Sequence, residues 1–342
     1  MALKDFSKRD VLKYAGNPSQ LFGVKDYTLN GGKASGVRAV DFRNGSGLEF
    51  TVLADRGMDF SSLSYKGINF SYISKTGVVA PQYYNEREIE WLRSFNAGFL
   101  TTCGLSNVGS PCTDSGESYG LHGRISNTPA EEFYAGTEWT SEGTVLKARG
   151  TIRECRVFGE NLVLTREIVC KCGENKFYIH DTVENCSFRV EPFMLLYHMN
   201  IGYPLLSENA YFVTPSSEVL PKDQAAAAGL KEYNRFQEPT PEYAEQVFYH
   251  DPKADETGST YAAVANSELD LTLVIRFKKA QLPRLTQWKQ MGEGEYVLGI
   301  EPCNCHVSGR AEERAGGTLQ YLQPGEIRHF DLEVEVVEGL PL

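Results

Sequence analysis

The chain has 342 residues, of which 41% are hydrophobic and 23% are charged, and its formal net charge is −11 at pH 7. Such a chain can bury a large hydrophobic core. The negative charge argues against nucleic acid as a partner, because phosphate binding requires clustered Lys and Arg. No apolar run approaches the ~18 residues of a membrane-spanning helix, so we expect no membrane partner.

Alternation of apolar and polar residues dominates the sequence and predicts strands. The first clear strand covers residues 48–53, and a turn follows at 54–57. A long hairpin is predicted from residues 162–172 and 177–183, which are joined by the polar turn Gly173-Glu174-Asn175. Further strands are predicted at 145–152, 269–277, 296–300 and 330–337.

Helix signals are few. Residues 85–95 place Ile89, Leu92 and Phe95 on one helical face, and the alanine-rich residues 224–230 predict a short helix. Residues 215–255 are irregular and predict a long loop or an excursion from the sheet. No repeat of 20–50 residues and no linker divides the chain.

Many strands with few short helices predict an all-β fold, a sandwich of large antiparallel sheets. In large sandwiches one sheet can be concave and open, which provides a ligand groove. We expect a single domain over residues 1–342, with an N-terminal extension of about residues 1–20.

The chain contains eight cysteines, an even number that would suit a disulfide framework. However, the chain is long, and its first ten residues are charged and lack the apolar segment of a signal peptide. We therefore expect reduced thiols and a cytoplasmic location. The pairs Cys170/Cys172 and Cys303/Cys305 lack the C-x-x-C spacing of zinc ribbons, so we expect no structural metal.

Three polar residues stand out because each follows an apolar or aromatic stretch and precedes Gly, Pro or a bend-forming residue. They are His122 in Gly120–Arg124, His198 in Tyr197–Asn200, and Glu301 in Gly299–Pro302. We expect strand ends to carry them to the rim of a concave sheet. A carboxylate and an imidazole that meet there form a general base and a general acid without a cofactor. The alternatives are a His198 bonded to a backbone carbonyl and a Glu301 paired with a structural arginine.

Several further side chains are candidates for binding a small polar ligand. Asn107 and Arg124 lie close to His122 in the sequence. Trp288 is a candidate stacking platform, with Lys289 beside it, although Trp288 could equally belong to the core. Arg56 lies in a tight turn and is either a binding residue or the partner of a neighbouring Asp.

In these segments the chain resembles the galactose mutarotase-like superfamily, and within it the aldose 1-epimerase-like bacterial proteins. The matching pieces occur in the family order and are Leu121-His122-Gly123, Asp181-Thr182-Val183-Glu184-Asn185, Tyr197-His198-Met199-Asn200, Leu298-Gly299-Ile300-Glu301-Pro302 and Leu322-Gln323-Pro324-Gly325-Glu326. The chain departs from the aldose epimerases where Met199-Asn200-Ile201 replaces the Tyr-Phe-Asn that usually follows the acid His.

The resemblance implies a β-supersandwich and an enzyme that interconverts the anomers of a free sugar. It assigns His198 as the acid, Glu301 as the base and His122 as a substrate-binding residue. The arginine that binds substrate in the family could correspond to either Arg56 or Arg124. No residue of this sequence can be matched to the family's substrate-binding Asp. We expect no cofactor and no metal, and the sequence leaves a homodimer open.

Mutarotation requires a base at the anomeric hydroxyl and an acid at the ring oxygen. We expect Glu301 and His198 to lie on opposite sides of the anomeric centre. If close together, they would raise the pKa of the His and lower that of the Glu. Two other hypotheses stay open: a different sugar isomerase, epimerase or lyase, with a metal held by His122, His198 and Glu301, and a non-catalytic carbohydrate-binding protein.

Overall fold

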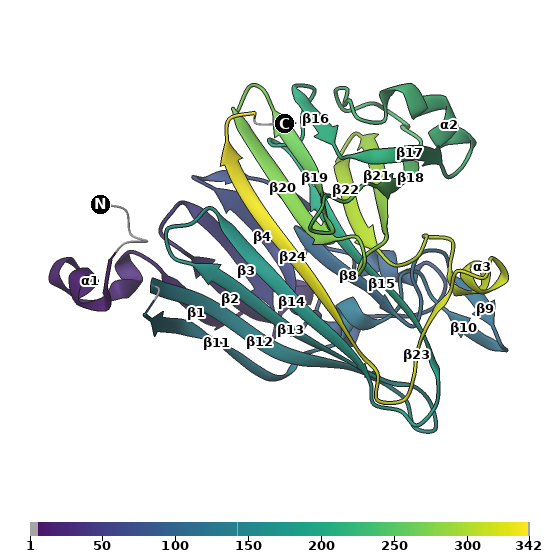
Figure 1. Ribbon diagram of the computed structural model, residues 1–342, viewed down its shortest axis with the longest axis horizontal. Helices are drawn as coiled ribbons and strands as arrows, with labels where there is room; N and C mark the ends of the chain where they lie inside the picture. Colours follow the sequence, from purple (N-terminus) through teal and green to yellow (C-terminus); the bar gives the residue numbers. More distant parts are fainter. Residues whose placement is uncertain (1–5, 142, 341–342) are drawn as a thin grey trace.

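The computed structural model describes residues 6–141 and 143–340. Two large antiparallel sheets, one of 12 strands and one of eight, pack against each other. In Figure 1, β24, β14, β13 and β12 of the smaller sheet run side by side. The prediction of an all-β sandwich of large antiparallel sheets with few short helices is confirmed.

The 12-stranded sheet combines the first strands of the chain with strands from its middle and from its C-terminal third. In spatial order its strands are β1 (Gly23–Thr28), β2 (Arg38–Arg43), β3 (Leu48–Leu53), β4 (Asp59–Tyr65), β8 (Leu100–Leu105), β15 (Glu191–Ile201), β22 (Glu295–Cys303), β21 (Arg284–Gly292), β18 (Gln246–Pro252) and β17 (Ser216–Pro221), with β5 (Ile68–Asn69) paired to β4 and β23 (Gln320–Leu322) paired to β15.

The eight-stranded sheet has the order β11 (Glu131–Thr140), β12 (Gly143–Cys155), β13 (Asn161–Lys171), β14 (Lys176–Asn185), β24 (Ile327–Glu338), β20 (Leu271–Lys278), β19 (Ser259–Asn266) and β16 (Ala210–Val213). Two small ribbons are formed by β6 (Tyr72–Ile73) with β7 (Ala97–Gly98) and by β9 (Cys112–Asp114) with β10 (Glu117–Tyr119). The α-helices are α1 (Lys8–Tyr14), α2 (Gln224–Gly229) and α3 (Arg310–Ala315).

The main hydrophobic core lies between the two sheets. Phe177 of β14 packs with ring centroids 4.8 Å from Phe50 of β3 and 5.2 Å from Phe60 of β4, so aromatic side chains join one sheet to the other. All three side chains are almost completely buried. Burial of aromatic surface of this kind is among the largest contributions to stability.

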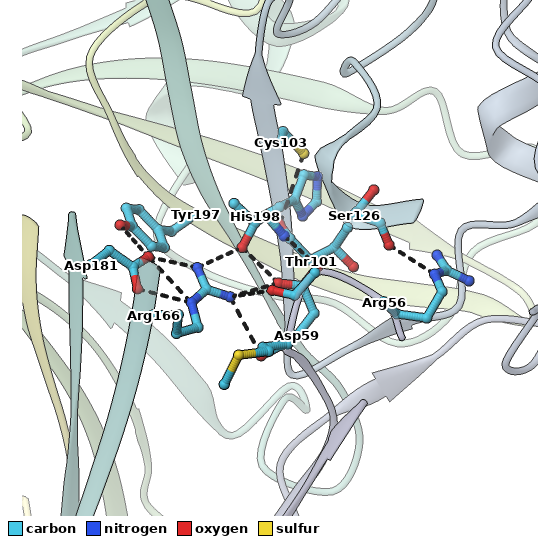
Figure 2. A network of polar contacts seen from close by, with 12 residues as sticks. Arg56, Asp59, Thr101, Cys103, Ser126, Arg166, Asp181, Tyr197 and His198 are labelled. Atoms are coloured by element: carbon cyan, nitrogen blue, oxygen red, sulfur yellow. Dashed lines mark hydrogen bonds and ion pairs between the residues drawn. The ribbon is translucent and has the colours of Figure 1, made fainter. Parts of the chain in front are cut away.

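A buried ion network also joins the sheets. Arg166 of β13 donates to Asp181 of β14 and, across the interface, to Asp59 of β4 and to the Thr102 hydroxyl of β8. Tyr197 of β15 donates to Asp181 at 2.8 Å. Figure 2 shows this network on the core side of β15, where Tyr197 extends away from its neighbour His198. The network fixes β4, β8 and β15 against the second sheet.

The predicted strands are confirmed, including the long hairpin, which is formed by β13 and β14 with Val169 opposite Tyr178. The predicted helix at 85–95 is wrong, because only a 3-10 turn at Glu90–Arg93 forms there. Trp91 and Phe95 stack with centroids 4.5 Å apart in a buried cluster, whereas Ile89 and Leu92 remain exposed. Tertiary packing of the two aromatic rings therefore overrides the helical pattern.

The loop predicted at residues 215–255 is only partly correct. The segment begins and ends with β17 and β18, which extend the 12-stranded sheet, and it contains the short helix predicted at 224–230 as α2. Prolines obscured these strands, since Pro221 and Pro252 are their last residues. A strand end can accept a proline because the missing N–H breaks no more than one ladder bond.

The N-terminal segment is anchored rather than separate. The helix α1 begins with a capping box at Ser7, and its Val11, together with Ala15, is buried in the main core. All eight cysteines carry free thiols, and Cys170 and Cys172 lie in the core as their strand position predicts. Within residues 6–141 and 143–340, no helix is long and apolar enough to cross a membrane.

Candidate active site

The centre of the candidate site is a cross-strand pair on the outer face of the 12-stranded sheet. In the register of β15 and β22, Leu196 lies opposite Cys303 and Met199 opposite Ile300, which places His198 opposite Glu301. Tyr197, Met199 and Ile300 point into the core, so alternation turns His198 and Glu301 to the other face. Both lie inside strands, so the expected position at strand ends is wrong.

His198 and Glu301 are in direct contact. His198 Nε2 lies 3.1 Å from Glu301 Oε1, and the two residues are only 5% and 2% exposed. Burial raises the pKa of Glu301 to about 8 and lowers the pKa of His198 to about 4. Desolvation disfavours both charged forms here, so the expected shifts, up for the His and down for the Glu, are wrong in sign. At neutral pH the pair holds one proton between the carboxyl group and the ring.

Gly299 and Trp288 shape the surface around this pair. Trp288 of β21 lies opposite Gly299 of β22, and Thr286 lies opposite Glu301, so these side chains share the outer face. A Cβ atom at Gly299 would lie 2.6 Å from Glu301 Oε1, 3.0 Å from Trp288 Cβ and 3.4 Å from His198 Cε1. Only glycine leaves room at this position for the carboxyl group, the imidazole and the indole to converge.

His122 approaches the pair from a loop rather than from a strand. Its ring centroid lies 5.7 Å from that of His198, and its backbone adopts a left-handed φ of 58°. His122 Nδ1 accepts the Gly109 N–H at 3.3 Å, so the ring proton is carried by Nε2. Burial and the neighbouring His198 hold the pKa of His122 well below its usual value. The ring is therefore a neutral hydrogen-bond donor.

These residues line one cavity of about 580 Å³. Glu301, His198 and His122 are among its polar groups, and Trp288 and Phe95 contribute aromatic faces. The His198 ring contacts both aromatic rings, with centroids 5.4 Å from each. The cavity thus combines a titratable pair with aromatic walls, an arrangement suited to a small polar ligand with apolar faces.

Four of the predicted binding residues do not line this cavity. The guanidinium of Arg56 donates to the backbone carbonyls of Ser126, Val79 and Ser94, and the bond to Ser126 is drawn in Figure 2. Arg124 pairs with the carboxylates of Glu86, Glu154 and Glu160. Both arginines are held by partners outside the cavity.

The other two are Asn107 and Lys289. The fully buried Asn107 donates to the Gly120 carbonyl at 2.8 Å, and so supports the loop that carries His122. Lys289 follows Trp288 on β21 and therefore points to the opposite face, where it donates to the Glu232 carbonyl at 2.9 Å. The structure brings together His122, His198, Trp288 and Glu301 of the predicted set.

The cavity also contains polar residues that the sequence did not single out. Glu245 accepts the Trp288 indole N–H at 2.8 Å, and Lys222 lines the same space. Both lie in the segment 215–255, for which the sequence predicts a long loop or an excursion from the sheet. Thr286 and Gln290 lie on the same face of β21 as Trp288, and the two-residue spacing was the signal that could have found them.

Comparison with known proteins decides the family. The model of a family described as "Domain of unknown function (DUF4432)" matches residues 34–336. The chain belongs to this family. A crystal structure described as a "putative aldose 1-epimerase" from Klebsiella pneumoniae subsp. pneumoniae MGH 78578 is 32% identical, with a TM-score of 0.90 over 94% of this chain and 87% of that chain. No curated protein matches the chain.

More distant structures share the fold of this family. A galactose mutarotase-like protein from Clostridium acetobutylicum is 13% identical, with a TM-score of 0.61 over 92% of this chain and 98% of that chain. A galactose 1-epimerase from Lactobacillus acidophilus NCFM is 14% identical, with a TM-score of 0.60 over 93% of this chain and 99% of that chain. The DUF4432 chain therefore has the galactose mutarotase-like fold.

Proposed function

We propose that this protein is a carbohydrate-active isomerase that interconverts the anomers of a free sugar by acid–base ring opening. The observation that carries the proposal is the contact of 3.1 Å between His198 Nε2 and Glu301 Oε1 on the wall of a cavity. Anomer exchange moves one proton onto a base and another from an acid, and a pair that holds one proton suits that exchange.

The chemistry follows from the position of the two groups. The Glu301 carboxylate takes the proton of the anomeric hydroxyl, and the His198 imidazolium gives a proton to the ring oxygen. Both oxygens are bonded to the same carbon, so two side chains that lie side by side can reach both. The two groups are direct neighbours on one sheet face. Their placement on opposite sides of the anomeric centre stays a prediction, which a complex with a sugar would test.

Burial favours the neutral pair, a carboxylic acid beside a neutral imidazole. Transfer of the shared proton from Glu301 to His198 gives the carboxylate and imidazolium that the reaction uses. This transfer changes no total charge, and so it avoids the cost of leaving an isolated charge in the buried site. After the reaction the pair again holds one proton.

The cavity supports binding of a sugar ring. Trp288 and Phe95 offer faces for the C–H groups of a sugar, and the neutral His122 offers an N–H to a hydroxyl. Glu245, oriented by its bond with the Trp288 indole, offers carboxyl oxygens that accept a hydrogen bond from a sugar hydroxyl. The volume of about 580 Å³ falls in the range of small-molecule sites.

The test is the rate of anomer exchange, followed by NMR, across a panel of free aldoses with and without a chelator. We expect the wild type to accelerate exchange of at least one sugar in both conditions. E301Q and H198N should each lose at least about 2 kcal/mol of transition-state stabilisation, or about 30-fold in rate. Matched controls are H250N, a buried His outside the cavity, and E191Q, a buried Glu on the same strand β15.

Three outcomes would contradict the proposal. Sugar binding without any acceleration would favour a non-catalytic binding protein. Acceleration that a chelator abolishes would favour a metal-assisted enzyme. Near-wild-type exchange by E301Q or H198N would remove these two residues from the proton-transfer roles.

A further inference from the structure

Two buried polar atoms on the site face of β15 have no hydrogen-bond partner among the described residues. They are His198 Nδ1 and Asn200 Oδ1. The two residues are 5% and 0% exposed, so the atoms have little access to solvent. An unsatisfied buried polar atom costs about 1–3 kcal/mol, and such a group calls for a physical explanation. Because the two atoms belong to neighbouring side chains, a hydrogen bond between them would satisfy both.

Their position in the strand makes this pairing feasible. Residues two apart in a strand present their side chains on the same face, so Asn200 follows His198 on the face that carries Glu301. Opposite Asn200 in the register lies Gly299 of β22, which has no side chain to separate them. A Cβ atom at Gly299 would lie only 3.4 Å from His198 Cε1, the carbon between the two ring nitrogens.

The orientation of the Asn200 amide is fixed by a second bond. Asn200 Nδ2 donates to the backbone carbonyl of His198 at 2.9 Å. Exchanging the amide oxygen and nitrogen would place an oxygen against that carbonyl and lose the bond. The oxygen of Asn200 is therefore the acceptor that remains for the ring, and the only N–H that His198 can offer it is at Nδ1.

We propose that Asn200 is a positioning residue that holds His198 as the Nδ1–H tautomer, leaving Nε2 to exchange a proton with Glu301. The resulting hydrogen-bond chain runs from the Glu301 carboxyl O–H to His198 Nε2, a contact that the structure shows. It continues from His198 Nδ1–H to Asn200 Oδ1, a bond that a rotation of these two side chains must complete, since neither atom has a partner in the part of the chain that the structure describes. The proposal goes beyond the proposed function and rests on it only for the catalytic consequence.

The opposite tautomer would leave both orphan atoms unsatisfied. It would place an N–H at Nε2, next to a carboxyl group that burial keeps protonated. In the proposed arrangement every donor and acceptor of the hydrogen-bond chain from Glu301 through His198 to Asn200 has a partner. Burial lowers the pKa of His198, and the Asn200 side chain partly offsets that shift. Asn200 thus assists the imidazole in taking the proton from Glu301.

The test is a long-range ¹H–¹⁵N NMR spectrum of protein labelled in histidine, with the His198 signals assigned by their loss in H198N. This spectrum distinguishes a protonated from an unprotonated ring nitrogen, and it requires no enzymatic activity. In the wild type we expect Nδ1 protonated and Nε2 unprotonated at neutral pH. A wild-type His198 with its proton on Nε2 would overturn the proposal, whatever the behaviour of any variant.

Two variants test the role of Asn200 itself. In N200A we expect the Nδ1–H tautomer to lose its preference, and in N200D the added carboxylate should raise the His198 pKa by at least about one unit. N266A, which changes a buried Asn of β19 in the other sheet, should leave the His198 signals unchanged. Wild-type tautomer and titration in a folded N200A would contradict the assignment.

The catalytic consequence has its own measurement. If the wild type accelerates anomer exchange, N200A should lower kcat at least about 10-fold with less than a twofold change in KM, because Asn200 acts on the acid and not on the sugar. An unchanged kcat would show that the tautomer does not matter for the reaction. If the wild type accelerates no sugar, the proposed function fails, while the tautomer spectrum still decides the role of Asn200.

Discussion

His198 of β15 and Glu301 of β22 lie opposite each other in the antiparallel register, and their side chains meet at 3.1 Å on the outer face of the 12-stranded sheet. Their strand neighbours Tyr197, Met199 and Ile300 point into the core between the sheets. Two strands that are far apart in the sequence thus bring together one carboxyl group and one imidazole. Because both are buried, they share a proton rather than carry separate charges.

The first prediction concerns the coupling of this pair. Because His198 and Glu301 exchange one proton, removing either disables the same step. The double variant H198N/E301Q should therefore lose no more than about 1 kcal/mol beyond the more impaired single variant. The measurement is the anomer-exchange rate constant of the four proteins on one sugar. Fully additive losses would indicate that the two residues act independently.

Gly299→Ala tests the space that the pair requires. The new Cβ would lie 2.6 Å from Glu301 Oε1, so the carboxyl group must move away from His198. We expect at least a ~10-fold lower exchange rate, equivalent to about 1.4 kcal/mol, together with a loss of about 1–3 kcal/mol in the free energy of unfolding. Gly16→Ala is the control, because nothing lies within 4 Å of a Cβ there. Unchanged activity would mean that the contact is not required.

The pH dependence of stability should report the buried carboxyl group. The unfolded chain releases the Glu301 proton near pH 4.5, whereas the folded protein holds it up to about 8. Between these values the folded state binds more protons, so its free energy of unfolding falls as the pH rises. E301Q lacks this loss, and its stability relative to the wild type should increase by at least about 1.4 kcal/mol from about pH 5 to about pH 8.

Urea unfolding of both proteins at several pH values measures this difference. His198 contributes with the opposite sign, because its folded pKa of about 4 lies below its ordinary value of 6.5. In that window the folded state binds fewer protons, and stability rises with pH. H198N should lack this rise, so comparing it with the wild type separates the contribution of His198 from that of Glu301. A difference between E301Q and the wild type that does not change with pH would show that Glu301 keeps an ordinary pKa.

The network behind the site should be essential for stability. Arg166→Met leaves the carboxylates of Asp181 and Asp59 buried without their partner. Breaking a buried ion pair from one side costs about 3–5 kcal/mol, measured by urea unfolding. Arg276→Met is the control, because its pairs with Glu333 and Glu335 are partly exposed and should contribute less than about 1 kcal/mol. Equal losses in both variants would contradict a special role for the Arg166 network.

Local patterns in the sequence were enough to predict the fold class and several of the strands. Alternating side chains are visible in a single segment, as in β3 and in the hairpin of β13 and β14, because each strand must bury one face. The same local signal, with the family resemblance, singled out His122, His198, Trp288 and Glu301. The local pattern gave a wrong prediction at residues 85–95, where Trp91 and Phe95 pack against distant segments. It also missed the strands β17 and β18, because each of them ends in a proline.

Which polar residues meet depends on how the strands pack together, and this could not be predicted from local sequence. Arg56, Arg124, Asn107 and Lys289 carry hydrogen-bonding groups that would suit a sugar, yet their partners are backbone carbonyls and carboxylates elsewhere. The register of β15 against β22 sets the contact of His198 with Glu301, and the absence of a side chain at Gly299 leaves room for it. The signs of the pKa shifts also depend on burial, and burial is a property of the assembled sheets that no single segment contains.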